Sequence, residues 1–388
     1  MRKMIIQNFI SWAETAPDPL RSQATHALAR AWITSEFSET EKQNVTAALT
    51  VLLDDPFPPV RMALAEVLAP CPDTPRHILY SLAEDVGEVA SIVFRHANAF
   101  TDDELIEAIE HPAPIVQVAL AQRRVLSARV CSALAKSGTR EACLVLLHSH
   151  VKQLTEDAVE QIWSRHVECA EIRGALLDLP ELAIHIRHDV LLKHALAVNS
   201  NLPALSDMPG ETKSPSSLAE ASDKIALRLS QEVGESCLLK LAEHLRATGQ
   251  LNTRLLLRAA CIGRFRLLAT SLSLLTGLSC ERVYNILASA RAVAVRALLK
   301  KAGIPMRAQQ IFLLVAEMVR MAEISFRKDL ALAEARLLSE ALLDEVQDET
   351  FAIDGDLKSF MRKFVIDTAR QEARAQVRTM SQKVLTAA

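Results

Sequence analysis

The chain has 388 residues, of which 50% are hydrophobic, 4% are aromatic and only 10 are glycine. This length is sufficient for two or three domains, and a core with few aromatic residues must be built from Leu, Ala, Val and Ile. Few glycines together with many alanines and leucines favour helices over β-hairpins and barrels. We therefore predict an all-α protein.

No segment has the features of a membrane span or a secretory signal. No stretch approaches the ~18 uninterrupted apolar residues of a spanning helix, and the apolar patch from Ile5 to Ile10 is too short for a signal peptide. The seven cysteines are scattered and never closely paired, which argues against a disulfide or zinc framework. We predict a cytoplasmic protein with reduced cysteines that act as small hydrophobic residues.

The net charge of −3 hides an uneven distribution. Residues 1–250 carry 23 Lys and Arg against 33 Asp and Glu, residues 251–310 carry 10 against 1, and residues 311–388 carry 11 against 13. A strongly basic segment therefore follows an acidic first half.

The N-terminal elements begin with an expected helix over residues 1–16 and a capping box at Ser38–Glu41, which predicts the start of another helix. Residues 54–61 form an acidic, proline-rich turn that ends in Val60-Arg61. This pattern resembles a HEAT repeat, in which such a pair opens the second helix. Residues 85–90 are a weaker copy that lacks the arginine.

Residues 73–182 repeat a helical hairpin four times. A short polar residue opens each hairpin, and at Thr101, Ser127 and Thr155 apolar residues flank the cap at the spacing of a hydrophobic staple. The units are 73–100, 101–126, 127–154 and 155–182. We expect a HEAT-like α-solenoid with an extended concave face and no single deep pocket.

The second half begins after a segment rich in Pro, Ser and Asn at residues 199–217, which we predict to be a linker. Helical periodicity then covers residues 222–301, with breaks near Gly249, Gly277 and Gly303. Residues 306–346 predict one or two long helices, and residues 357–385 a final helix. The predicted organisation is a HEAT-like repeat domain (1–198), a linker (199–217), a basic helical domain (218–306) and a C-terminal hairpin of long helices (307–388).

The basic segment, residues 254–307, is the strongest candidate for a binding surface. Like charges spaced four residues apart on one helix face, as at Arg254 and Arg258, are mildly destabilising without an anionic partner. That partner is a nucleic-acid backbone, an anionic membrane, an acidic protein or the acidic first half of the same chain. The candidate anion-binding residues are Arg254, Arg258, Arg264, Arg266, Arg291, Arg296, Lys300 and Lys301, with Arg282 and Arg307 in the same segment.

Histidines offer the best metal candidate, but we predict no metal and no cofactor. His185 and His188 are three residues apart, so they share a helix face, with Asp189 beside them and His194 further on. A solvated helix face accounts for the same pattern. His148 and His150 are two apart and point away from each other on a helix. There is also no phosphate-binding glycine loop, zincin motif or nucleophile elbow.

Several segments together resemble a widespread alphaproteobacterial family known as a domain of unknown function with HEAT-like helices. The resemblance covers about two-thirds of the chain. It rests on residues 55–66, the joint at 100–103, and the segments 251–260, 274–278 and 296–305. It implies a helical-repeat fold and a bacterial origin, and it transfers no active-site residues.

These observations predict a non-enzymatic scaffold or regulatory adaptor that binds a protein partner through a helical-repeat surface. One alternative is double-stranded nucleic-acid binding through residues 254–307. A second is a hydrolase or glycosylase that modifies nucleic acid on a HEAT-like scaffold. The sequence does not determine the oligomeric state, and dimerisation through the C-terminal helices is one option it leaves open.

Overall fold

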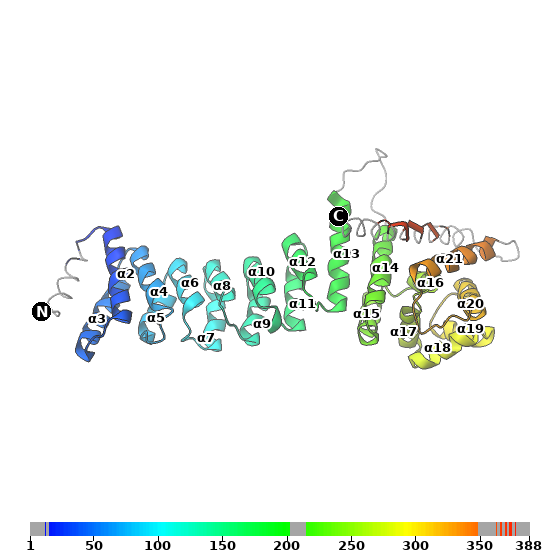
Figure 1. Ribbon diagram of the computed structural model, residues 1–388, viewed down its shortest axis with the longest axis horizontal. Helices are drawn as coiled ribbons and strands as arrows, with labels where there is room; N and C mark the ends of the chain where they lie inside the picture. The colour runs from blue at the N-terminus through cyan, green and yellow to red at the C-terminus, as the bar shows by residue number, and fades with distance from the viewer. Residues whose placement is uncertain are drawn as a thin grey trace, which may run out of the picture. The chain divides into compact units, whose positions relative to one another are not determined.

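The computed structural model describes residue 12, residues 15–201 and 215–347, and residues 362, 365, 366, 369, 370, 372–374 and 377. Every regular element in this part of the chain is a helix, so the predicted all-α class is confirmed. The chain divides into two compact units, Met1–Leu182 and Ala183–Ala388, and each is described here by itself (Figure 1).

The first unit consists of short helices in two layers. Its helices are α2 (Asp18–Thr34), α3 (Glu39–Val51), α4 (Pro58–Leu68), α5 (Arg76–Ala83), α6 (Gly87–His96), α7 (Asp102–Glu107), α8 (Pro114–Ala121), α9 (Ala128–Ser137), α10 (Arg140–Ser149), α11 (Glu156–Arg165) and α12 (Ala170–Leu177). Three short 3₁₀ turns, η1 (Leu52–Asp54), η2 (Ala108–Glu110) and η3 (Val151–Gln153), follow α3, α7 and α10. The even-numbered helices contact one another in succession from α2 to α12, and α7, α9 and α11 do the same in the second layer.

Local sequence signals explain where these helices begin. Ser38 and Thr101 form the two predicted capping boxes, in which the N-cap side chain and a glutamate three residues later each bond a free backbone N–H. Ser127 and Thr155 cap α9 and α11 as predicted. Each of the four predicted hairpin units contains two α-helices. Among the second helices, α10 starts after the N-cap Thr139 and α8 starts with Pro114, while α6 and α12 lack a side-chain cap bond.

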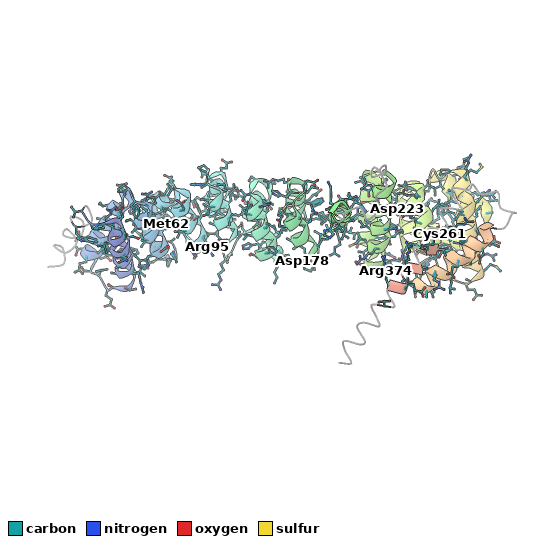
Figure 2. The ribbon with its side chains drawn as sticks, turned by 90° about the horizontal axis from the view of Figure 1, so that it is seen from above. Met62, Arg95, Asp178, Asp223, Cys261 and Arg374 are labelled. Atoms are coloured by element: carbon teal, nitrogen blue, oxygen red, sulfur yellow. The ribbon has the colours of Figure 1, made fainter. Side chains whose placement is uncertain are left out.

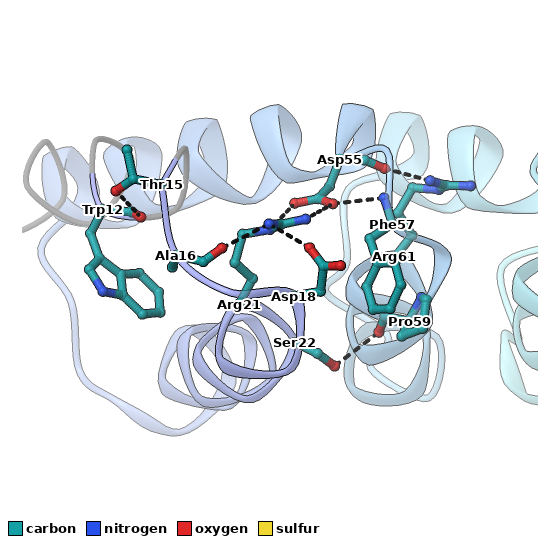
Figure 3. Close-up of polar contacts among 10 residues, drawn as sticks. All are labelled: Trp12, Thr15, Ala16, Asp18, Arg21, Ser22, Asp55, Phe57, Pro59 and Arg61. Atoms are coloured by element: carbon teal, nitrogen blue, oxygen red, sulfur yellow. Dashed lines mark hydrogen bonds and ion pairs between the residues drawn. The ribbon is translucent and has the colours of Figure 1, made fainter.

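Two arginines join consecutive turns of the first layer, and Figure 3 shows their contacts with Asp55. Arg21 donates from Nε and Nη2 to the two carboxylate oxygens of Asp55, at 2.9 and 3.0 Å, and from Nη1 to the carbonyl of Ala16. Arg61 donates to the backbone carbonyl of Asp55 and to both carboxylate oxygens of Asp85, with an Nη2–Oδ1 distance of 2.7 Å. Bidentate arginine–carboxylate pairs fix geometry as well as adding energy, so each arginine holds its own turn against the next one.

Further along the first unit, contacts with backbone groups join neighbouring helices in both layers. Gln117 of α8 donates to the carbonyl of Ile109 at 2.7 Å and accepts from the backbone N–H of Thr139 at 2.8 Å. Arg165 donates to carbonyls at the end of α9, those of Ala135 and Gly138, at 2.9 and 2.7 Å. These bonds satisfy helix-end and turn carbonyls that have no partner within their own helix.

The second unit packs its helices around α16 and α17. Its helices are α13 (Ile184–Asn201), α14 (Pro215–Glu232), α15 (Glu235–Ala247), α16 (Thr253–Cys261), α17 (Phe265–Thr276), α18 (Cys280–Ser289), α19 (Ala292–Lys301), α20 (Met306–Met321) and α21 (Leu332–Gln347). Every residue of α16 from Leu255 to Cys261 is buried. Phe265 at the start of α17 is fully buried and packs against Phe326, with ring centroids 4.6 Å apart.

Glycines end three of these helices as the sequence predicted. Gly249, Gly277 and Gly303 all adopt the left-handed conformation, which is strained for residues with a Cβ atom. Gly263, between α16 and α17, has φ = +69° as well, and a Cβ atom there would collide with the side chain of Leu330. The α16–α17 corner therefore depends on glycine for two reasons.

The two domain boundaries predicted from the sequence differ from the observed division. The chain divides between Leu182 and Ala183, earlier than the expected linker, because α13 packs against α14 and α15. Residues 202–214 of that linker lie outside the described residues. The predicted separate hairpin is not distinct in its described part either, since α20 and α21 contribute Phe312, Val315 and Leu342 to the core of α16–α19. Most of the predicted final helix, residues 357–385, lies outside the described residues, although those described there are helical.

Candidate binding surfaces

The predicted anion-binding residues separate into an inward and an outward group. In the inward group, Arg254 donates from Nε to Oδ2 of Asp223 at 2.8 Å. Arg258 is buried, with Nη1 3.4 Å from the same oxygen and Nη2 3.5 Å from Oε1 of Glu220. Asp223 belongs to α14 and is labelled in Figure 2. Burial raises the pKa of Asp223, although Arg254 and Arg258 act in the opposite direction. In a buried ion pair, the cost of removing the charges from water opposes their attraction for each other.

Arg264 and Arg266 also face the interior of the second unit. Arg264 is buried and donates to the carbonyl of Leu330 at 2.8 Å, and burial lowers its pKa. Arg266 donates to the carbonyl of Val233 at 2.8 Å, and its backbone N–H donates to Asp329 at 2.9 Å. Internal compensation therefore accounts for half of the predicted binding residues. The acids that provide it, Glu220, Asp223 and Asp329, all belong to the second unit.

The outward group lies on α19 and its ends, with one residue on α18. Arg282, Arg291, Arg296, Lys300 and Lys301 are exposed. Within the described residues none of these five side chains forms an ion pair. Arg307 is exposed as well and makes other contacts.

Two exposed apolar side chains belong to the same stretch of sequence as this outward group. Val293 is 84% exposed and Met306 is 81% exposed. Val293, Arg296 and Lys300 share the outer face of α19, because they are three and four residues apart, while Val295, Leu298 and Leu299 of the same helix are buried. Exposed apolar residues ringed by charge are typical of protein-binding surfaces.

The first unit contains a cleft of about 510 Å³ lined by α5, α6, α7 and η2. Phe94 is buried at its base, and Tyr80 and Phe100 pack as an edge-to-face pair with ring centroids 5.9 Å apart. Its carboxylates are Glu84, Glu104, Glu107 and Glu110. The cleft is open to solvent, which agrees with the extended surface without a deep pocket that the sequence predicted. Its three aromatic side chains all come from the hairpin of residues 73–100.

Among the described residues, one of the four carboxylates is engaged in hydrogen bonds. Glu104 accepts from the backbone N–H of Thr101 at 2.7 Å and from the Tyr80 hydroxyl at 2.7 Å. These bonds lower the pKa of Glu104, with the backbone bond as the main cause. Glu84, Glu107 and Glu110 form no ion pair or side-chain hydrogen bond within the part of the chain that the structure describes. The cleft is thus lined by aromatic side chains and by three carboxylates that have no partner among the described residues.

The histidines noted in the sequence lie in different environments. His150 is buried with Nε2 3.0 Å from the carbonyl of Ala121, whereas His148 and His194 are exposed. His188 and Asp189 instead meet His244 of α15, a residue that sequence reasoning missed. No local signal links His244 to His188, because the two lie on different helices.

Hydrogen bonds tie these three side chains together. Oδ1 of Asp189 lies 2.8 Å from Nε2 of His244 and 3.3 Å from Nδ1 of His188. Burial alone would raise the pKa of Asp189, but the hydrogen bonds from His188 and His244 lower it to about 2. The ring of His185 lies beside that of His244, with centroids 5.9 Å apart.

The fold and these surfaces define a class of all-α protein in which short helical hairpins and a second helical unit carry charged faces. A family model for uncharacterised proteins conserved in bacteria (DUF2336) matches residues 89–352, so the chain belongs to this family. The matched range contains α19, the cluster of His188, Asp189 and His244, and the cleft lining from Phe94 onward. Comparisons with curated proteins and with solved structures give no match. No helix among the described residues is long and apolar enough to cross a membrane.

Proposed function

We propose that this protein is a non-enzymatic adaptor that binds a protein partner through its first, HEAT-like unit. A basic segment of the partner enters the cleft between α5, α6 and α7. The observation that supports this proposal is that one concavity of about 510 Å³ is lined both by aromatic side chains and by three carboxylates that form no ion pair among the described residues.

The chemistry of the cleft suits arginine and lysine side chains. A cation over an aromatic face within about 6 Å gains roughly 0.5–2 kcal/mol, and Tyr80 and Phe100 offer such faces. Glu84, Glu107 and Glu110 add charge attraction at the exposed rim. Residues 1–182 carry 16 Lys and Arg against 25 Asp and Glu, and this field of net −9 would accelerate the encounter with a basic partner. The volume lies within the range of ordinary ligand sites.

The test is binding of a fluorescein-labelled basic peptide, composed of arginine and leucine, measured by fluorescence anisotropy. We expect the triple variant Glu84→Gln, Glu107→Gln, Glu110→Gln to bind at least tenfold more weakly than the wild-type protein. The three substitutions replace exposed side chains, so folding should be unaffected.

The matched control carries the same loss of charge elsewhere in the first unit. Asp157→Asn, Glu160→Gln and Glu181→Gln remove three exposed carboxylates outside the cleft. If this control weakens binding as much as the cleft variant does, the peptide responds to net charge alone and the cleft is not the site. Replacing Tyr80 by alanine then separates stacking from charge, because it leaves Glu84, Glu107 and Glu110 in place.

A second candidate is an anionic partner at the outer face of α19. An acidic protein is favoured over a nucleic acid because Val293, on the same face of α19 as Arg296 and Lys300, is exposed. If the five outward cations each neutralised one phosphate, the slope of log K against log salt would be about −4.5, and affinity would fall roughly 500-fold between 50 and 200 mM salt. A titration of duplex DNA over this range tests the nucleic-acid alternative.

The inward group bears on the remaining alternative, an enzyme that modifies nucleic acid. Such an enzyme needs a cationic groove that faces its substrate. Arg254, Arg258, Arg264 and Arg266 bond to Asp223, Glu220 and backbone carbonyls instead, so we do not propose this activity.

A further inference from the structure

The cluster of His188, Asp189 and His244 has the composition and spacing of a metal site. The carboxylate oxygen lies 3.3 and 2.8 Å from the two imidazole nitrogens, and the three ligand atoms all lie within 4.8 Å of one another. Ligands about 2.0–2.1 Å from a tetrahedral zinc ion are separated by roughly 3.4 Å. Around an ion the two short edges of the triangle would lengthen by less than ~1 Å, and the third edge already lies within 4.8 Å.

The contacts of His188 involve both of its ring nitrogens. Ser222 donates from Oγ to the amide oxygen of Gln250, which leaves the Ser222 oxygen able to accept from Nε2–H of His188, 3.3 Å away. Nδ1 of His188 faces Oδ1 of Asp189 at 3.3 Å, and this contact is a hydrogen bond when Nδ1 carries the proton. In the tautomer with the proton on Nε2, Nδ1 has a free lone pair, and a cation between Nδ1 and Oδ1 would bind both atoms.

We propose that a divalent zinc ion binds Nδ1 of His188, Oδ1 of Asp189 and Nε2 of His244. Two imidazoles with one carboxylate suit zinc and its late first-row neighbours better than calcium or magnesium, which prefer oxygen ligands. Ser222 and Gln250 then supply the outer hydrogen bonds that orient a metal-binding histidine.

The accessibility of the three ligands suggests how the ion would be held. His188 is fully buried, while the Asp189 side chain is 34% exposed. The site is therefore closed on its inner side and open to solvent beside Asp189, where water would complete the coordination shell. The ion would link α13, the first helix of the second unit, to α15.

This inference does not depend on the proposed adaptor function. The test uses the full-length protein after removal of metal with a chelator, and titration of the refilled site with ZnCl2 by calorimetry. Co2+ serves as a second probe, since its visible absorption reports nitrogen and oxygen ligands directly. We expect one zinc ion per chain at a site that Asp189→Asn and His244→Gln abolish.

Two further variants distinguish this site from surface histidines and from misfolding. His194→Gln changes an exposed histidine of α13 and should leave zinc binding unchanged. Ser222→Ala should weaken it about ten- to a hundredfold by removing the orienting bond. Asp189→Asn keeps the size of the side chain, and circular dichroism checks its fold. Equal zinc binding by folded Asp189→Asn and wild-type protein, or no binding by the wild type, would overturn the proposal and leave three side chains held together by hydrogen bonds alone.

Discussion

Replacing Asp223 by asparagine removes the acid that compensates two arginines of the basic segment. Asp223 and Arg258 are 2% and 5% exposed, so neither can turn to water without opening the packing of α14 on α16. Removal of one partner of a buried ion pair costs about 3–5 kcal/mol, because the other charge stays buried without compensation.

The expected cost lies at the lower end of that range. Glu220 also lies near Arg258, at 3.5 Å, and retains part of the attraction. Arg254 is 30% exposed and can extend its charge toward solvent. We therefore expect a loss of about 3 kcal/mol, which is a factor of about 150 in the folding equilibrium. Most of this loss comes from Arg258.

Urea unfolding followed by circular dichroism measures this change. Hydrogen exchange of α14 and α16 then assigns the change to the second unit. The double variant Asp223→Leu, Arg258→Met should recover most of the stability, because burial already raises the pKa of Asp223 and the pair gains little over apolar packing. If Asp223→Asn unfolds at the same urea concentration as the wild type, the inward arginines do not need this acid, and our division of the basic segment is wrong.

Three other outcomes follow from the structure. Gly263→Ala should destabilise the protein by about 2–4 kcal/mol through left-handed strain and collision with Leu330, whereas Gly277→Ala, with open space around it, should cost only about 1 kcal/mol; thermal melts of both variants compare them. Hydrogen bonds to Glu104 lower its pKa, so the stability that this carboxylate contributes is present above pH 4.5 and is lost as the pH falls below that value. Glu104→Ala should therefore lower the melting temperature at pH 7 and have little effect at pH 3. Arg61→Met should loosen the joint between α4 and α6, which faster hydrogen exchange in α6 would reveal; unchanged exchange there would contradict a joining role.

Much of the fold could be read from short segments of the chain. Ser38, Thr101, Ser127 and Thr155 predicted their helix starts correctly, because an N-cap acts on backbone groups only two or three residues away. The glycines that end helices were equally clear, since the left-handed conformation is a local requirement. The domain boundary was not, because it depends on where α13 packs.

The candidate sites show the same limit. The sequence identified the excess of basic residues between 254 and 307, but it did not separate inward from outward side chains. Arg258 meets Asp223, 35 residues earlier, and Arg264 meets the carbonyl of Leu330, 66 residues later. Nothing in the spacing of the arginines distinguishes them from the exposed Arg296.

What the sequence by itself determined is the helical class, the helix caps and the family. The class and the caps follow from composition, periodicity and interactions within a few residues of one another, and the family follows from short segments that resemble its members. Only the tertiary structure showed the cleft beside Tyr80, which arginines are paired and which are exposed, and the contact of Asp189 with both His188 and His244. Those features join residues on different helices, and the loop-closure and packing that bring them together leave no local trace in the sequence.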